Sequence, residues 1–288
     1  MDDGELENMK STLLVSVLMT SYNRENYISE AIESVLYSSY RNFELIIVDD
    51  CSKDKTVEIA KGYAAKDQRV KVFVNEKNLG DYPNRNKAAS YAVGEYLKYV
   101  DADDYIYPWG LELMVNMMEK YPAAGWGLCS LDQFVERPFP FQLTPREAYE
   151  YSYLGPGLFH KAPLSSIIRR KVFEEAGGFS AQRMSGDYEM WHRLALRYPI
   201  LLMPQGMVWY REHGDQEIKS FFQYIETYEK ISLRYLTLPE CPLEKEVVAK
   251  ILRKNRRDRT LELLKAAVKL RPGEVKSIWA RLQLYYAQ

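Results

Sequence analysis

The chain has 288 residues, of which 27% are charged and 47% are hydrophobic, and 39 Lys/Arg against 40 Asp/Glu give a net charge of −1. This length suits one or two domains with buried cores. The balanced charge and high hydrophobic fraction exclude a disordered chain and give no overall argument for binding nucleic acid. The three cysteines, Cys51, Cys129 and Cys241, are too widely spaced for a disulfide framework or a zinc cluster, which indicates a reducing compartment.

The first part of the chain does not resemble a targeting segment. Its longest early apolar stretch, residues 13–19, is too short to cross a membrane, and the ten residues before it are acidic rather than basic. We therefore expect a soluble cytoplasmic protein, with a peripheral position on a membrane surface as the alternative.

Charge is distributed unevenly along the chain. From Lys245 onward there are 12 Lys/Arg against four Asp/Glu, a charge of +8, which leaves −9 for the preceding residues because the whole chain carries −1. Such a shift in composition marks a domain boundary.

Strands and helices are predicted to alternate through the first hundred residues. Near-continuous apolar runs predict strands, hydrophobic spacing of three to four residues predicts helices, and this alternation is typical of an open, twisted, mostly parallel sheet flanked by helices. The predicted strands are 13–20, 43–50, 70–75 and 95–104, and the predicted helices between them are 27–37, 56–65 and 85–93.

The rest of the chain is predicted to be richer in helix. A helix is expected over 107–121, an irregular loop or hairpin over the aromatic segment 138–153, and a strand entering a helix over 165–179 that stops at Gly177 and Gly178. Further predictions are a helix over 187–198, strands over 200–203 and 206–210, and helices over 218–236, 243–257, 259–270 and 275–286.

Acidic residues follow two of the predicted strands. Asp49 and Asp50 end the second strand, and Asp101, Asp103 and Asp104 follow the fourth. Since ligands of open α/β sheets bind beyond the carboxyl ends of the strands, these carboxylates should share one crevice with residues 20–23, which follow the first strand. Like charges repel there, and a hard divalent cation such as Mg²⁺ would relieve them. An isolated Asp at such a place is an ordinary helix cap, but two clusters favour the cation.

Several nucleotide and metal motifs are missing from the sequence. The chain has no G-x-G-x-x-G after its first strand, no phosphate loop of the ATPase type, no H-E-x-x-H and no cysteine pair at metal spacing. A bound nucleotide would therefore need its phosphates neutralised in another way, and a cation held by the acidic residues supplies one.

Taken together, the motifs resemble those of a family 2 glycosyltransferase of the GT-A fold. The resemblance covers residues 12–216, and it implies a flexible segment 1–11 and a basic helical extension 217–288 on either side of the transferase domain. The matching pieces are VSVLMTSYN (15–23), FELIIVDDCSKDKT (43–56), NLGDYPNRNKAA (78–89), GEYLKYVDADD (94–104), IIRRKVFEEAGGF (167–179), SGDYEMWHRL (185–194) and WYREHGD (209–215).

This resemblance implies a nucleoside-diphosphate-sugar donor, with a UDP-sugar favoured, and inverting transfer to a saccharide or lipid-linked acceptor. Thr20, Tyr22 and Asn23 should line the base and ribose pocket, and Asp50 should meet the base edge. Arg85 should contact the donor or order its loop.

The D-x-D motif of the family is matched by Asp101 and Asp103. The resemblance implies that Asp101 meets the sugar or ribose and that Asp103 binds Mg²⁺ or Mn²⁺, with Asp104 as a second candidate for the metal. His213 is implied as a metal or diphosphate contact, and Arg211 as a contact to phosphate oxygens.

The general base of an inverting transfer is expected in a G-D or E-D motif at the start of a helix, which Gly186-Asp187 matches. An Asp at this position is otherwise an ordinary cap. Asp187 is the predicted base and Glu189 the alternative, while His192 is assigned to packing or a polar contact. The aromatic residues of 138–157 either stack on acceptor sugars or form a hydrophobic cluster.

Three functions stay open from the sequence. The first is a metal-dependent inverting glycosyltransferase of bacterial polysaccharide or lipopolysaccharide synthesis; the others are a non-catalytic nucleotide-sugar-binding module and a nucleotidyltransferase. The basic extension has three interpretations: a solvated appendage, a contact to an anionic membrane, or a homodimer contact. Its short KNRRDR run is too little to argue for nucleic acid.

Overall fold

The structure is a computed structural model that describes residues 13–132, 137–213, 221–269 and 272–286. The predicted N-terminal segment 1–11 lies outside these residues, as do residues 214–216 at the end of the predicted transferase domain and parts of two predicted helices, 218–220 and 270.

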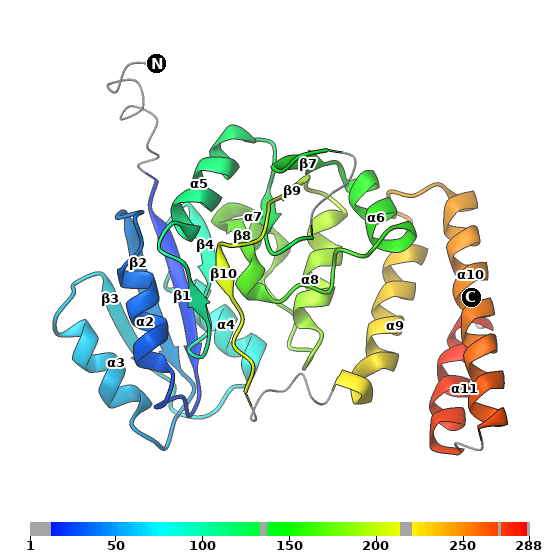
Figure 1. The fold of residues 1–288 in the computed structure, drawn as a ribbon, viewed down its shortest axis with the longest axis horizontal. Helices are drawn as coiled ribbons and strands as arrows, with labels where there is room; N and C mark the ends of the chain where they lie inside the picture. The colour runs from blue at the N-terminus through cyan, green and yellow to red at the C-terminus, as the bar shows by residue number, and fades with distance from the viewer. Residues whose placement is uncertain (1–12, 133–136, 214–220, 270–271, 287–288) are drawn as a thin grey trace.

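Strands and helices alternate as predicted in the first half (Figure 1). The strands are β1 (Val15–Ser21), β2 (Phe43–Asp49), β3 (Val70–Val74), β4 (Tyr96–Tyr99), β5 (Tyr105–Ile106), β6 (Trp126–Leu128), β7 (Phe141–Leu143), β8 (Ser166–Arg169), β9 (Ile200–Leu202) and β10 (Val208–Trp209). The helices are α2 (Ile28–Leu36), α3 (Thr56–Ala64), α4 (Asp81–Ser90), α5 (Gly110–Lys120), α6 (Pro145–Leu154), η1 (Pro163–Ser165), α7 (Arg170–Ala176), α8 (Gly186–Ala195), α9 (Phe221–Thr237), α10 (Lys245–Val268) and α11 (Pro272–Tyr286).

A mostly parallel sheet forms the centre of the molecule. In the described part of the chain its eight strands have the order β3-β2-β1-β4-β8-β6-β9-β7, and only β8 and β7 run against the others. β1 pairs with both β2 and β4 in parallel, so the carboxyl ends of these three strands lie at one edge of the sheet. β10 pairs with β5 in a separate two-stranded ribbon.

Each face of the sheet is covered by its own set of helices. One hydrophobic cluster joins the sheet to α2, α3 and α5, and the other joins it to α4, α6, α7, α8 and α9. Every residue of β2 is buried, which explains why its central run Leu45–Val48 is continuously apolar rather than alternating. The predicted Gly stop of α7 is confirmed, since Gly177 has a left-handed φ of 80°.

The prediction of an irregular loop or hairpin over 138–153 is wrong. The segment forms β7, which pairs with β9, and then the helix α6. Thr144 accepts a hydrogen bond from the backbone of Glu147, whose side chain bonds back to Thr144, and Pro145 occupies the first helical turn. This capping box starts the helix, and the aromatic residues behind it supply its buried side.

The C-terminal helices differ from prediction in one respect. The two helices expected over 243–257 and 259–270 form one continuous helix, α10, because the charged residues between them do not break a helix. α10 packs against α11 and α11 against α9, and the three lie at the side of the molecule opposite β3 (Figure 1). No helix of the described residues has the length and apolar character needed to span a membrane.

Candidate active site

The turn after β2 is held by carboxylate–hydroxyl contacts with the turn after β1. Asp49 accepts hydrogen bonds from Ser21 Oγ (2.9 Å) and from Ser52, through its backbone N–H (2.8 Å) and its Oγ (2.5 Å). Asn23, at a φ of 52°, donates its backbone N–H to Ser52 Oγ and accepts from the N–H of Lys53. Tyr22 stands beside this network with 45% of its surface exposed. The side chains predicted for a base and ribose pocket thus lie at one edge of the sheet.

Asp50 is buried and directs both carboxylate oxygens at the segment before α4. It accepts hydrogen bonds from the N–H groups of Leu79 (2.8 Å) and Gly80 (2.9 Å) and from the side-chain amide of Asn75 (2.8 Å). Gly80 has a φ of 87°, which only glycine adopts readily. Asp50 therefore positions the start of α4, and its contact with a base stays a prediction.

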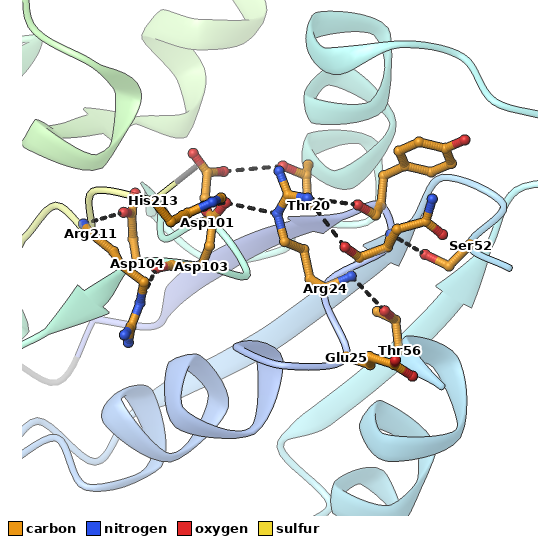
Figure 2. Close-up of polar contacts among 12 residues, drawn as sticks. Thr20, Arg24, Glu25, Ser52, Thr56, Asp101, Asp103, Asp104, Arg211 and His213 are labelled. Atoms are coloured by element: carbon orange, nitrogen blue, oxygen red, sulfur yellow. Dashed lines mark hydrogen bonds and ion pairs between the residues drawn. The ribbon is translucent and has the colours of Figure 1, made fainter. Parts of the chain in front are cut away.

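Arg85 forms a buried two-pronged ion pair with Asp101. Its Nη1 and Nη2 lie 2.7 and 2.8 Å from the two carboxylate oxygens, and its Nε lies 2.8 Å from Asp81. Burial alone would lower the pKa of Arg85, but the charges of Asp101 and Asp81 raise it well above its ordinary value. Thr20 Oγ1 also donates to Asp101, over 3.1 Å (Figure 2). The side chain of Arg85 thus anchors the D-x-D turn to α4.

Asp103 lies between two cationic or potentially cationic groups (Figure 2). Its Oδ2 is 2.7 Å from Arg24 Nε and 3.0 Å from His213 Nε2, and its side chain is 13% exposed. The imidazole of His213 stacks on the ring of Tyr27 at 4.8 Å between centroids. Segments that are far apart in sequence, after β1, after β4 and after β10, thus meet at one carboxylate.

The segment after β10 also grips the D-x-D turn through Arg211. Its Nε donates to the carbonyl oxygen of Asp103 (2.8 Å), and its backbone N–H donates to Asp104 Oδ1 (3.1 Å). Asp104 is buried, and its burial, together with the charge of Asp101, raises its pKa to about 8. Asp104 is thus buried beneath the segment of Arg211, whereas the Asp103 side chain is 13% exposed. Which of the two would bind a metal stays a prediction.

Asp187 is the second residue of α8 and is held by a tyrosine from α4. Its Oδ1 accepts hydrogen bonds from the hydroxyl of Tyr82 (2.9 Å) and from the backbone N–H of Tyr188 (2.7 Å). Burial raises the pKa of Asp187 to about 6, although both hydrogen bonds oppose the rise. A Cβ at Gly186 would lie 2.7 Å from atoms of the Tyr82 ring, so the glycine of the G-D motif lets that ring reach the carboxylate.

One helix therefore organises the carboxylates of the site. The N–H of Gly80, directly before α4, binds Asp50, Tyr82 in its first turn binds Asp187, and Arg85 one turn later binds Asp101. Residues three apart share a side of a helix, so Tyr82 and Arg85 tie Asp187 and Asp101 to the same side of α4.

Two other polar residues of α8 belong to the packing of the fold. Glu189 is buried, accepts from Arg193 (2.8 Å) and is hydrogen-bonded by the hydroxyl of Tyr235. His192 is fully buried, burial lowers its pKa to about 3, and Tyr153 Oη lies 2.6 Å from its Nε2. The assignment of His192 to a polar packing contact is confirmed.

The aromatic side chains of the segment around α6 join the hydrophobic core. Phe141 and Tyr149 are buried, and the other three pack against the same cluster. Of the two interpretations of this segment, packing is the one that the structure supports. The residues concerned are Phe139, Phe141, Tyr149, Tyr151 and Tyr153.

Two site residues were not predicted from the sequence. Arg24 directly follows the predicted pocket residue Asn23 in the sequence. Because a carboxylate such as Asp103 is stabilised by a nearby cation, an arginine at this position could have been considered as its partner. Tyr82 lies in the N-L-G-D-Y-P run, where α4 begins four residues before the predicted start. With the helix placed correctly, its three-residue spacing from Arg85 would have indicated a shared role.

The residues around Asp103 fit a divalent cation that is shared with a substrate. Within the described residues no three or more His, Cys, Asp and Glu side chains are grouped to hold a metal alone. The Oδ2 of Asp103 and the Nε2 of His213, 3.0 Å apart, nevertheless offer one hard oxygen and one imidazole ligand. Mg²⁺ commonly binds one or two protein ligands and completes its shell with substrate phosphates.

A mostly parallel sheet, an acidic turn after β4 and a partly buried carboxylate at the start of α8 together make the arrangement expected of a glycosyltransferase of the GT-A fold. The chain matches the sequence profile of Glycosyl transferase family 2 over residues 16–177. The chain belongs to this family of glycosyltransferases.

Curated relatives agree with this assignment. An uncharacterized glycosyltransferase of Methanocaldococcus jannaschii is 44% identical over 206 residues, which cover 69% of this chain and 70% of that protein. The putative teichuronic acid biosynthesis glycosyltransferase TuaG of Bacillus subtilis is 39% identical over 151 residues, 49% of this chain and 59% of that protein. The chain spans about half the length of several curated relatives that it matches.

Solved structures confirm the GT-A fold. TarS of S. aureus, residues 1–349 with UDP-GlcNAc, has a TM-score of 0.62 at 22% identity over 83% of this chain and 70% of that one. The mannosyltransferase PcManGT of Pyrobaculum calidifontis, with GDP-Man and Mn²⁺, has a TM-score of 0.58 at 17% identity over 95% of this chain and 86% of that one. At these identities the likeness shows the fold alone.

Proposed function

We propose that the chain transfers a sugar from a nucleoside diphosphate to an acceptor hydroxyl with inversion, in a reaction that depends on a divalent cation. The observation that carries this proposal is the arrangement around α4, which brings the D-x-D carboxylate Asp101 and the half-buried carboxylate Asp187 to the same helix. A donor held at the first and an acceptor at the second would meet there.

The donor is assigned to the edge of the sheet formed by β1, β2 and β4. Thr20, Tyr22 and Asn23 are assigned to the base and ribose, and Asp101 to the ribose or sugar. Asp50 is proposed to approach the base edge, and it already holds the loop that begins α4. A UDP-sugar is favoured because uracil offers an N–H donor to a carboxylate, and a nucleotide sugar accompanies the fold in TarS with UDP-GlcNAc.

Asp187 is proposed as the general base. A pKa of about 6 leaves it ionised at neutral pH yet basic enough to accept the proton of an attacking hydroxyl. Tyr82 and Tyr188 both donate to Oδ1, and these two contacts fix the orientation of the carboxylate. A single displacement by a hydroxyl activated in this way inverts the anomeric centre.

The two guanidinium groups and the imidazole beside Asp103 are proposed to stabilise the leaving diphosphate. Arg24, Arg211 and His213 surround Asp103 and would face the charge that grows as the glycosidic bond breaks. Asp103 and His213 would hold Mg²⁺ or Mn²⁺, which supplies further positive charge to a diphosphate when bound. Mn²⁺ is present in PcManGT, which has the same fold.

The biological role is proposed from the relatives. TuaG is named for teichuronic acid biosynthesis, which supports a cell-surface polysaccharide or a lipid-linked saccharide as the acceptor. We assign transfer to residues 12–216 and treat residues 217–288 as a helical extension that is attached through α9, where the hydroxyls of Tyr188 and Ser232 lie 2.6 Å apart. Cytoplasmic action and a homodimer are further parts of this proposal.

The test is transfer from a panel of UDP-, GDP- and dTDP-sugars with Mn²⁺ or Mg²⁺, with the product anomer read by NMR. The expected result is transfer with inversion that Asp187→Asn lowers at least about 100-fold, in the range of a general base. Tyr188→Phe serves as a control, since its hydroxyl points to Ser232. Retention of configuration, undiminished activity of Asp187→Asn, or release of pyrophosphate from nucleoside triphosphates would each overturn the proposal.

A further inference from the structure

The outer side of α10 carries an unusual set of exposed residues. Between positions 250 and 269, all of which the structure describes, every exposed side chain is cationic or apolar. We call this set the basic face; it consists of Lys250, Arg253, Lys254, Arg256, Arg257, Leu261, Leu264, Lys265, Ala267, Val268 and Lys269.

The apolar members of the basic face are exposed to a degree that is costly for large side chains. Leu261 is 47% exposed, Leu264 is 58% exposed and Val268 is 84% exposed. They follow the cations in one stripe, since positions 250, 254, 257, 261, 264 and 268 alternate steps of four and three along a single side of the helix. The stripe is cationic in its first half and apolar in its second.

Acidic side chains between positions 250 and 269 offset only part of the charge of this face. The two carboxylates within the same stretch, Asp258 and Glu262, are only partly exposed. Glu262 is engaged by Arg259 and lies 3.6 Å from Arg281 on α11, while Asp258 lies 3.5 Å from Arg257.

The inner side of α10 is built differently. Ile251 and Ala266 are buried there, and Arg259 pairs with Glu229 of α9 at 3.0 Å. Cations on the inner side therefore have carboxylate partners within the helical extension.

Helix α11 adds aromatic residues to the same region. Trp279 is 51% exposed and Tyr286 is 60% exposed, and their seven-residue spacing puts them on one side of α11. The guanidinium of Arg256 lies 5.3 Å from the centroid of the Tyr286 ring, which places this side of α11 beside the basic face. Trp and Tyr are the aromatic residues that favour a membrane–water interface.

We propose that the basic face binds the surface of an anionic lipid bilayer. Leu261, Leu264 and Val268 would enter the headgroup region while the cations meet lipid phosphates, which is the behaviour of a basic amphipathic helix at an interface. The helix α10, which carries this face, lies at the side of the molecule opposite β3 (Figure 1). This binding does not depend on glycosyl transfer.

Charge decides between a bilayer and other occupants. A second copy of the chain, packed face to face about a two-fold axis, would bring two sets of like charges together. A nucleic acid would satisfy the cations but would leave the row of Leu and Val side chains in water. An anionic bilayer satisfies both parts of the stripe.

The experiment is co-sedimentation of the full chain with phosphatidylcholine vesicles, with and without roughly one-third phosphatidylglycerol, at about 0.1 M and about 0.5 M NaCl. The first variant, Lys250→Gln/Lys254→Gln/Lys265→Gln, removes three exposed charges, and the second is Leu264→Ser/Val268→Ser. Matched controls make the same changes elsewhere on the exposed surface: Lys61→Gln/Lys66→Gln/Lys120→Gln and Leu113→Ser/Val93→Ser.

We expect binding only to the anionic vesicles, weakened by salt. The lysine variant should partition roughly 100-fold more weakly, and the Leu/Val variant about tenfold more weakly, while both controls bind like the wild type. Unchanged melting temperatures show that the variants fold. The proposal is overturned if the wild type ignores anionic vesicles, if the controls lose binding equally, or if the lysine variant instead dissociates a dimer or loses only nucleic-acid binding.

Discussion

Replacing Tyr82 by Phe tests whether the helix α4 tunes the proposed base. The change removes one hydroxyl and keeps the buried ring. In the wild type this hydroxyl donates to Asp187 Oδ1 over 2.9 Å, and burial, reinforced by the charge of Asp187, raises the pKa of Tyr82 well above its ordinary value. The phenol therefore stays protonated, and stays a donor, throughout the pH range in which Asp187 titrates.

The size of the effect follows from the strength of that hydrogen bond. A hydrogen bond to a charged group contributes about 1.5–3 kcal/mol, and a change of one unit in pKa corresponds to about 1.4 kcal/mol. At the lower end of this range, losing the bond from the ionised form raises the pKa of Asp187 from about 6 to about 7. A base must be ionised to act, so activity falls as the pH drops through this pKa.

The assay is the pH profile of kcat/KM for release of nucleoside diphosphate. Its acid limb should move up by about one unit in Tyr82→Phe, which lowers the rate about threefold near pH 6.5 and leaves the two enzymes alike above pH 8. Tyr188→Phe removes a hydroxyl that points to Ser232 and should leave the limb in place. An acid limb that does not move in Tyr82→Phe, or that moves as far in Tyr188→Phe, would refute the reasoning.

Three further predictions concern the same site. Asp187→Asn should melt at a higher temperature than the wild type at pH 8 but not at pH 4. The reason is that the pKa of Asp187 in the folded protein, about 6, lies above its ordinary 3.8. The free energy of unfolding of the wild type therefore falls as the pH rises between these two values, by at most roughly 3 kcal/mol. Asp103→Asn should abolish the rise in melting temperature produced by UDP with Mn²⁺. Asp104→Asn changes a buried carboxylate and should keep that rise. The reverse result would assign the metal to Asp104. Gly186→Ala should push the Tyr82 ring away from Asp187 and lower kcat at least tenfold, which a steady-state assay on a variant of verified fold measures; unchanged kcat would show that this close contact is not required.

Much of the fold could be predicted because the decisive signals are local. The apolar runs of β1 and β2 and the amphipathic spacing of α2 and α3 locate these elements to within two residues. The helix α6 was missed because the aromatic residues and prolines around it were interpreted as an irregular loop or hairpin. Thr144, Pro145 and Glu147 nevertheless form the pattern of a helix start. The strand β6 was not predicted because its three residues are too few for a periodic pattern. It forms through its pairing with β8 and β9 in the sheet.

In the candidate site, too, the local motifs could be predicted and the long-range contacts could not. Asp101, Asp103 and Asp187 stand in motifs that can be read from the sequence, and the structure does bring them to one region. What each carboxylate contacts could not be read, because Arg24 and Tyr82 reach their partners across 79 and 105 positions of the chain. Such pairings depend on how strands are ordered in the sheet, which periodicity along the chain does not encode.

The spacing of Tyr82 and Arg85 on α4 has a consequence for specificity. Three residues of an α-helix advance by about 4.5 Å along its axis. The backbone of α4 therefore sets the distance between Arg85, which binds Asp101, and Tyr82, which binds Asp187. Under the proposed mechanism, this fixed spacing keeps the reacting groups in the same places whichever sugar is transferred. An insertion or deletion between Tyr82 and Arg85 would turn one of these side chains away from the side of α4 that holds the other.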